Sequence, residues 1–174
     1  MISGKLDLAE VRAKLELLGG PGKESLGRRM AVAAGRVFRN EAEQQVPVGK
    51  NEWSAQAQFG GSNNAGLLKD SLYVAFNDKQ STSTTFVYSV SWNRKQAPHG
   101  HLLEFGHWRP YAIIFSPKYG WRTDKSRPLP GQGVWVRAVP FLGPAYHMGK
   151  NEAFAVALKV GREEFPKILA GQTP

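Results

Sequence analysis

The stretch HGHLLEFGH, from His99 to His107, places three histidines and one glutamate within nine residues. Imidazole nitrogens and carboxylate oxygens are ligands of zinc and iron, and two histidines two residues apart can bind one metal from a strand. The spacing matches no metal-binding signature, and the glycines at positions 100 and 106 leave the backbone conformation open. We therefore expect ordinary polar histidines here, and a protein that binds no metal or other cofactor.

Other catalytic patterns are missing from the sequence. There is no cysteine, which excludes thiolate metal sites and cysteine nucleophiles. The chain contains no P-loop, no G-x-S-x-G elbow and no dinucleotide-binding fingerprint. The adjacent carboxylates of Glu163 and Glu164 would point about 100° apart on a helix, so they do not face one substrate. The sequence therefore predicts that the protein is not an enzyme.

The chain is basic, and its charge is unevenly distributed. It carries 23 basic and 14 acidic side chains, a net charge of +9. Residues 109–140 contain six basic side chains and one acidic side chain, a net charge of +5. This segment favours an anionic partner, either nucleic acid or an acidic protein surface. No apolar run is long enough to span a membrane, and MISGKLDLAEV does not have the pattern of a secretion signal, so we expect folding in the cytoplasm.

Apolar spacing predicts three helices in a single domain that spans residues 1–174. The first covers about residues 8–18, and the second runs from Glu24 to Gln45. The third begins near Pro144 and ends at Pro166. The expected buried faces are Leu26, Met30, Ala34, Val37 and Ala42 on the second helix, and Met148, Ala155, Leu158 and Phe165, beside Phe154, on the third.

Two runs alternate as strands do, Leu72–Phe76 and Phe86–Trp92, and NDKQSTS between them predicts a turn. Residues 49–66 have no period and predict a long loop. YAIIF and VWVRAV flank SPKYGWRTDKSRPLPGQG, which predicts an extended hairpin with a long loop, the basic arm 109–137. We therefore expect an α+β fold, with N-terminal helices and a C-terminal helix packed on a small antiparallel sheet.

Several short motifs follow one another in a recognisable order: a helix that ends in Val-Pro, a glycine-led strand start, E-F-G and P-F-L-x-P-A. The residues that carry them are Val46, Pro47, Gly66, Leu67, Ser71, Glu104, Phe105, Gly106, Pro140, Phe141, Leu142, Pro144 and Ala145. This order resembles the tail-completion (neck) proteins of long-tailed bacteriophages, the "gene ten" family of HK-type lambdoid phages, over about residues 8–165. The loop 49–66 and the basic arm are longer than in that family and look like insertions.

The resemblance implies a structural protein of the virion neck, made in the host cytoplasm and assembled as a six- or twelve-fold ring between the portal or connector and the tail. Its implied partners are copies of itself and other neck, connector, tail-terminator or tail-tube proteins. It also implies that E-F-G is a structural corner. Phe105 would pack beneath the helices, Gly106 would adopt a conformation that a side chain hinders, and Glu104 would cap or pair.

The two insertions are the expected contacts with neighbouring molecules, because both are too polar and irregular for a small core. The expected contact residues are Trp53, Phe59, Arg109, Lys118, Trp121, Arg122, Lys125, Arg127 and Arg137. The basic arm has two possible partners, an acidic protein and the phosphates of passing DNA. We favour the protein, because a strongly basic channel would retard DNA.

The rival interpretation is a basic nucleic-acid-binding protein with tryptophan stacking platforms. The candidate platforms are Trp92, Trp108, Trp121 and Trp135. This interpretation requires aromatic and basic side chains on one face of a strand. The alternation in Phe86–Trp92 is instead typical of a buried face, so we favour the structural protein.

Overall fold

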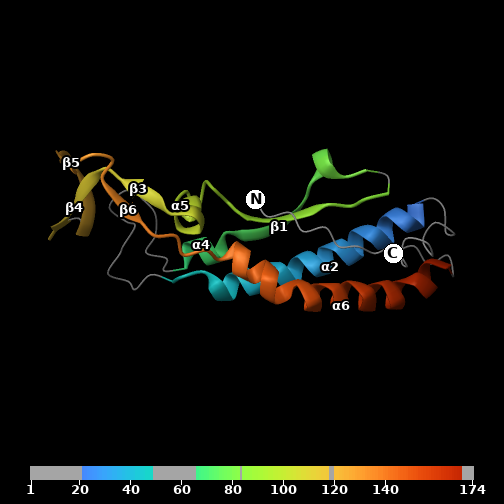
Figure 1. Cartoon of the computed structure of the whole chain (residues 1–174). Helices are drawn as coiled ribbons and strands as arrows, with labels where there is room; N and C mark the ends of the chain where they lie inside the picture. Colours follow the sequence, from blue (N-terminus) through green and yellow to red (C-terminus); the bar gives the residue numbers. More distant parts are fainter. Residues whose placement is uncertain (1–20, 49–65, 83, 118–119, 170–174) are drawn as a thin grey trace. The chain divides into compact units, whose positions relative to one another are not determined.

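The protein is represented by a computed structural model that describes residues 21–48, 66–82, 84–117 and 120–169 (Figure 1). The described residues group into two compact units. Unit 1 contains residues 21–44, 72–91 and 142–169, and unit 2 contains residues 45–48, 66–71 and 92–141. The expected helix 8–18 and nearly all of the loop 49–66 lie outside the described residues, and the single domain stays a prediction. The helices and small antiparallel sheets confirm the α+β class.

Helix α2, Pro21–Gln45, confirms the long N-terminal helix. It ends before Val46-Pro47 because a residue that precedes proline resists the helical conformation. Its buried residues are Leu26, Met30, Ala34 and Ala42, with Val37 partly buried. The spacing of the apolar residues therefore predicted both the length of this helix and its buried face.

Strands β1, Leu72–Phe76, and β2, Tyr88–Trp92, form a two-stranded sheet, as predicted. Hydrogen bonds close both ends of the pair: the Asn77 N–H donates to the Val87 carbonyl at 2.8 Å, and the Asn93 N–H donates to the Ser71 carbonyl at 2.9 Å. These pairings run in opposite directions along the two strands, so the sheet is antiparallel. The turn between them contains a 3-10 helix, η1, Asp78–Gln80.

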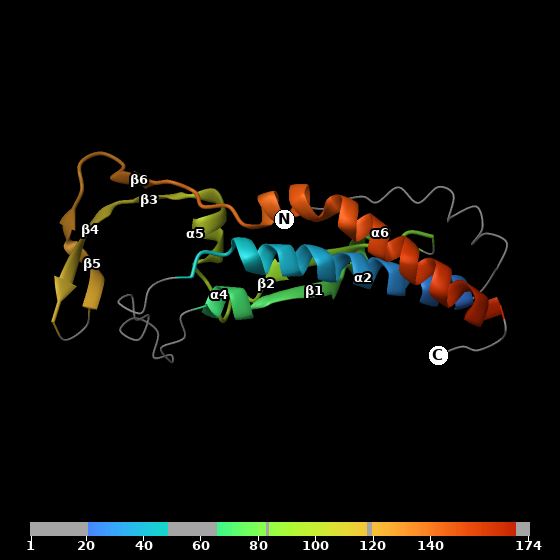
Figure 2. The same ribbon diagram turned by 90° about the horizontal axis from the view of Figure 1, so that it is seen from below.

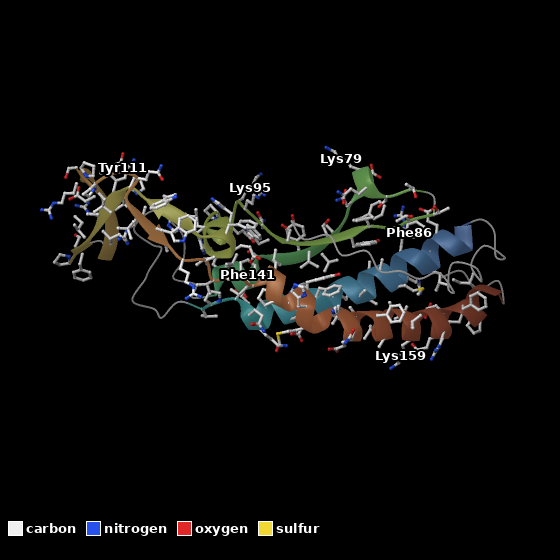
Figure 3. All side chains as sticks on the ribbon, viewed as in Figure 1. Lys79, Phe86, Lys95, Tyr111, Phe141 and Lys159 are labelled. Carbon is white, nitrogen blue, oxygen red and sulfur yellow. The ribbon has the colours of Figure 1, made fainter. Side chains whose placement is uncertain are left out.

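The sheet packs on α2 where the helix carries glycine. A Cβ at Gly35 would lie 2.7 Å from Cγ1 of Val74, and a Cβ at Gly27 would lie 2.4 Å from Cδ2 of Phe86, which is labelled in Figure 3. Real Cβ atoms do not approach other atoms so closely. The missing side chains therefore let the sheet lie directly against the helix backbone.

Helix α6, Leu142–Leu169, lies beside α2 (Figures 1 and 2), but its predicted buried face is correct only in part: Phe165 packs against the buried cluster and Leu158 is half-buried. Met148 is 63% exposed, Phe154 is 38% exposed, and Ala155 is also exposed. The buried residues instead recur every four positions: Ala145, Gly149, Ala153, Ala157 and Gly161. Small residues are buried here because they let two helix backbones approach closely. Pro166 lies inside the helix and does not end it.

The contacts of this small-residue face are made with α2. A Cβ at Gly161 would lie 3.0 Å from Cε of Met30, and one at Gly149 would lie 3.1 Å from Cγ of Glu41. Leu26, Met30 and Ala34 of α2 form one buried cluster with Ala153 and Ala157 of α6. The helix pair is therefore the core of unit 1.

Unit 2 contains two short helices and four strands. The helices are α4, Leu67–Asp70, and α5, Gly100–Phe105. The strands are β3, His107–Arg109, β4, Tyr111–Ser116, β5, Gly120–Pro128, and β6, Val134–Val136. No helix in the described part of the chain is long and apolar enough to cross a membrane.

The strands of unit 2 form one long hairpin, which we call the ribbon, residues 107–136. Its antiparallel pairs are β3 with β6 and β4 with β5. The hairpin was expected, but the long loop inside it was not correct, because half of that segment, Gly120–Pro128, is strand β5. A ribbon without a buried face needs no apolar alternation, so its sequence carries no strand signal.

Candidate functional site

The ribbon is anchored where the E-F-G and P-F-L motifs meet. The Glu104 carboxylate is 7% exposed and accepts a hydrogen bond from the Phe141 N–H at 2.8 Å. The Phe141 ring is fully buried and packs edge-on against Trp92 at 5.8 Å. A second bond, from the Val139 N–H to the Leu103 carbonyl at 2.8 Å, ties the returning chain to α5. Both ends of the ribbon are therefore fixed to one small core.

Gly106, between α5 and β3, leaves space for the ring of Trp135. Its φ of 72° lies in the left-handed region, and a Cβ there would lie 2.8 Å from both Cζ2 of Trp135 and the Val136 carbonyl oxygen. This confirms that a side chain is hindered at position 106. The Trp135 ring lies close to Gly106 because glycine leaves room for it.

Phe105 does not pack as expected, since its ring is 61% exposed. The buried positions of α5 are Gly100 and Glu104, which are four residues apart and lie on one face of the helix. Phe105 follows Glu104 by one residue and so points about 100° away from that face. The burial of the neighbouring glutamate therefore places this phenylalanine on the surface.

Two tryptophans pair at the base of the ribbon. Trp108 on β3 lies opposite Trp135 on β6, with ring centroids 5.4 Å apart and planes at 64°. Each side chain remains about half exposed, at 51% and 49%. Val134, next to Trp135, is also exposed, as are Val139 and, further along the ribbon on β4, Phe115. Unit 2 therefore carries several large apolar side chains that are exposed.

Cations accompany these apolar side chains. Arg122, Lys125, Arg127 and Arg137 are exposed, and Arg109 is partly buried. Asp124 is the only acidic residue between positions 107 and 136. The surface of the ribbon is therefore basic and apolar together.

The Asp124 carboxylate is already engaged within the ribbon. It accepts hydrogen bonds from the Ser126 N–H at 3.0 Å and the Ser126 hydroxyl at 2.6 Å, and Nε of Arg127 lies 3.4 Å away. The hydrogen bond from the Ser126 hydroxyl is the main cause that lowers the pKa of Asp124. These contacts hold a bulge, because residues 125–127 have no partners on β4 between Ala112 and Tyr111.

The histidines of the opening stretch do not converge. His99 and His101 are exposed at the start of α5, and His107 lies on β3. Burial, and then the charge of His101, lower the pKa of His99. In residues 21–48, 66–82, 84–117 and 120–169, no three side chains of the metal-ligating types come together.

The predicted contact residues have mixed outcomes. Trp53, Phe59 and Lys118 lie outside the described residues, as does the side chain of Trp121. The structure places four of the described cations on the ribbon and the fifth, Arg137, directly after it. Of the suggested stacking platforms, Trp92 is 6% exposed and packs on Phe141, so it is part of the core and that prediction is wrong.

Most of the remaining motif residues lie at the ends of helices or in the buried parts of the two units. Val46 and Leu142 are buried, Ala145 is buried on α6, and Pro144 lies in its first turn. Gly66 has a φ of 99° before Leu67 begins α4, and the buried Ser71 donates from its hydroxyl to the Leu68 carbonyl at 2.7 Å. Pro47 and Pro140 are exposed. The sequence analysis did not predict that Phe115 and Val134 are exposed. The prolines at positions 110, 117 and 128 were the available signal, because they interrupt the segment around these residues.

Residues 9–106 match a protein family described as "Bacteriophage HK97-gp10, putative tail-component". The matched span covers more than half of the chain and ends at Gly106, at the entrance to the ribbon. No curated protein and no solved structure matches the chain. The family match therefore includes α2, the β1–β2 sheet and the E-F-G corner, and stops before the Trp108–Trp135 pair.

Proposed function

The chain belongs to the HK97 gp10-like family of bacteriophage tail components, and from this premise we propose that it is a structural protein of the virion neck that assembles as a ring between the portal or connector and the tail. The family is one of structural tail components and not an enzyme family. We extend this to the chain itself, which on this proposal acts through surfaces and turns over no substrate.

The observation that carries the proposal is the uncovered ribbon. Isolated two-stranded ribbons are marginally stable in water and need a third strand or a packed layer. Here Trp108, Phe115 and Trp135 are each about half exposed or more. Apolar patches of this kind mark protein interaction sites. On the proposal, neighbouring molecules complete the ribbon in the assembled neck.

Ring closure requires a heterologous interface, in which each copy offers two different complementary surfaces. The ribbon supplies one of them. It lies beyond the family match at 9–106, so it is the part of the chain through which this protein would fit its own partners. The predicted partners are copies of itself and the neck or tail proteins above and below the ring.

The chemistry of the ribbon favours a protein partner over passing DNA. Duplex DNA offers phosphates to cations, but it gives half-exposed indole and phenyl rings no apolar cover. An acidic protein surface with an apolar centre satisfies both parts of the ribbon. Among the candidate platforms whose side chains the structure describes, the alternative, a nucleic-acid-binding protein, retains Trp108 and Trp135, whose rings already contact each other edge-to-face.

The structure provides a clean deletion to test assembly. The Leu129 N–H donates to the Pro110 carbonyl at 2.8 Å, so residues 111–128 can be replaced by an Asn-Gly turn without disturbing β3 and β6. A matched control replaces Lys125 and Arg127 with Gln and keeps the strands. We expect the deletion to abolish tail joining in a complementation assay while the helical circular dichroism is retained. Normal tail joining by the deletion variant would overturn the role of the ribbon.

A salt titration separates the two partner classes. Cations that bind phosphates give an affinity that falls steeply with salt concentration. We expect no measurable affinity of the full chain for double-stranded or single-stranded DNA even at low salt. Tight, salt-dependent binding that is lost with Trp108→Ala would instead support the nucleic-acid alternative.

A further inference from the structure

Two of the three two-stranded sheets in the described residues, β4–β5 and β1–β2, leave uncharged strand edges without a described partner. β4 pairs only with β5, and β1 pairs only with β2. The outer edge of a strand presents unpaired N–H and C=O groups that can template another strand. The described part of the chain thus offers two possible donors and two possible acceptors for strand addition.

The two edges of the ribbon differ in how they are protected. β4, YAIIFS, carries no charge and no proline, and it is bounded by Pro110 and Pro117. β5 carries the bulge at 125–127, Pro128 and several cations. Bulges, charges and prolines are the features that block strand addition. Only the β4 edge is therefore open to a further strand.

The two edges of the β1–β2 sheet differ by charge. β2 is followed by the exposed cations Arg94 and Lys95, which would repel a basic ribbon. β1, LYVAF, is uncharged and is flanked by Lys69-Asp70 and Asp78-Lys79, each pair neutral overall. Within unit 1, Figure 2 shows no described helix or strand beyond β1 on the side away from β2. The β1 edge is therefore the better acceptor.

We propose that β4 of one copy adds to the free edge of β1 in a second copy of this chain, giving a four-stranded sheet in the order β5, β4, β1, β2. The contact joins two different surfaces, so repetition can close a ring, and the inference rests on the proposed function. It places the cations of β5 at the outer edge, two strand spacings or about 10 Å from β1, where salt screens them.

A second copy of this chain can bind at β1 because the pairing keeps the cations of β5 away from that strand. A chain with a net charge of +9 repels its copies wherever basic surfaces meet. β4 is the one strand of the β4–β5 pair without a charged side chain. Docking through β4 therefore brings backbone and apolar groups to the neighbour, while the basic face remains available for an acidic protein.

Cysteine cross-linking tests this pairing directly, because the chain contains no cysteine of its own. Tyr73 on β1 is 43% exposed and points away from the α2 side of the sheet, where Val74 packs on Gly35. We combine Tyr73→Cys with a single cysteine at each position from 112 to 116 in the full chain. Disulfides need Cβ atoms about 4 Å apart, so only side chains on the same face of a shared sheet can join.

The expected result is a ladder of covalent multimers on non-reducing gels. It should appear at one or two alternate β4 positions and be missing at the positions between them, as the two-residue period of a strand requires. Each single-cysteine variant should stay monomeric under denaturing conditions. Equal ladders at all five positions would indicate random collisions and overturn the pairing.

Three other outcomes bear on this inference and on the proposed function. Closed rings in native mass spectra without any ladder would overturn the β4–β1 contact and leave the ring intact. Monomers without a ladder would overturn both. Efficient dimers from a single β4 cysteine would show that two β4 strands pair with each other, which would also overturn the proposal.

Discussion

Replacing Ala157 with Leu should destabilise the protein far more than replacing Met148 with Ala. Ala157 is 1% exposed on the small-residue face of α6, whereas Met148, the larger and more apolar residue, is 63% exposed. A leucine at 157 must fit three additional carbons into the cluster with Leu26 and Met30. Helix propensity changes little in this substitution, so packing decides its effect.

The sizes of the two effects follow from burial. Overpacking of a tight core costs about 1–3 kcal/mol, which we expect for Ala157→Leu. Full burial of a methionine side chain contributes roughly 1.5–3 kcal/mol, so one that is about one third buried contributes about 0.5–1 kcal/mol. Met148→Ala should therefore lower the free energy of unfolding by about 1 kcal/mol at most.

Urea unfolding followed by far-UV circular dichroism measures both variants, because α2 and α6 dominate the helical signal. Ala157→Ser is a useful control, since it adds only one atom and should cost less than the leucine. If Met148→Ala proved the more destabilising of the first two, the assignment of the small-residue face to the interface with α2 would be refuted.

Three further predictions concern the ribbon anchor and the helix pair. Gly106→Ala should weaken the β3–β6 pairing by at least about 1–2 kcal/mol, because it combines a left-handed backbone with a clash, and the near-UV signal of the tryptophan pair should fall. Glu104→Ala should cost about 1–3 kcal/mol in urea unfolding by leaving the Phe141 N–H without its acceptor, whereas Glu104→Gln should cost less. The pKa of Glu164 is lowered chiefly by a hydrogen bond from Lys167, so its stabilisation is complete above the ordinary value of 4.5 and is lost as pH falls through the lower folded-state pKa. Glu164→Gln should therefore flatten the acid side of the stability profile, and an unchanged profile would contradict this role.

The parts of the fold that could be predicted from sequence are those with one buried face. The apolar residues of α2 recur with helical spacing because one side packs on other elements, and Val46-Pro47 marks its end. The alternating residues of β1 and of the segment 86–92 include Val74 and Phe86, which pack against Gly35 and Gly27 of α2. In each case the buried face imposes a regular spacing of apolar residues, and this spacing is visible in the sequence.

The errors also have a physical cause. On α6, side-chain size was taken as a sign of burial, but close helix packing selects Gly149 and Ala153 and leaves Phe154 partly outside. The sequence of β5 predicts a loop, because a strand with no buried face has no alternation of apolar and polar residues. The sequence showed E-F-G and P-F-L as separate motifs. Their contact through Glu104 and Phe141, 37 residues apart, depends on tertiary structure and became visible only there.

The family match and the sequence resemblance agree on a phage tail component, while the ring and the place in the neck remain proposals. The ribbon follows the matched region and combines exposed aromatic residues with cations. On our proposal, the ribbon makes this protein's own contacts, and the matched region supplies the framework that it shares with the family.

A native mass spectrum of the purified full chain tests the central claim most directly. The account predicts a single closed species whose mass is a fixed integral multiple of the chain, together with its loss when residues 111–128 are replaced by an Asn-Gly turn. A monomer at all concentrations, or an assembly of the same copy number without the β4–β5 pair, would contradict it.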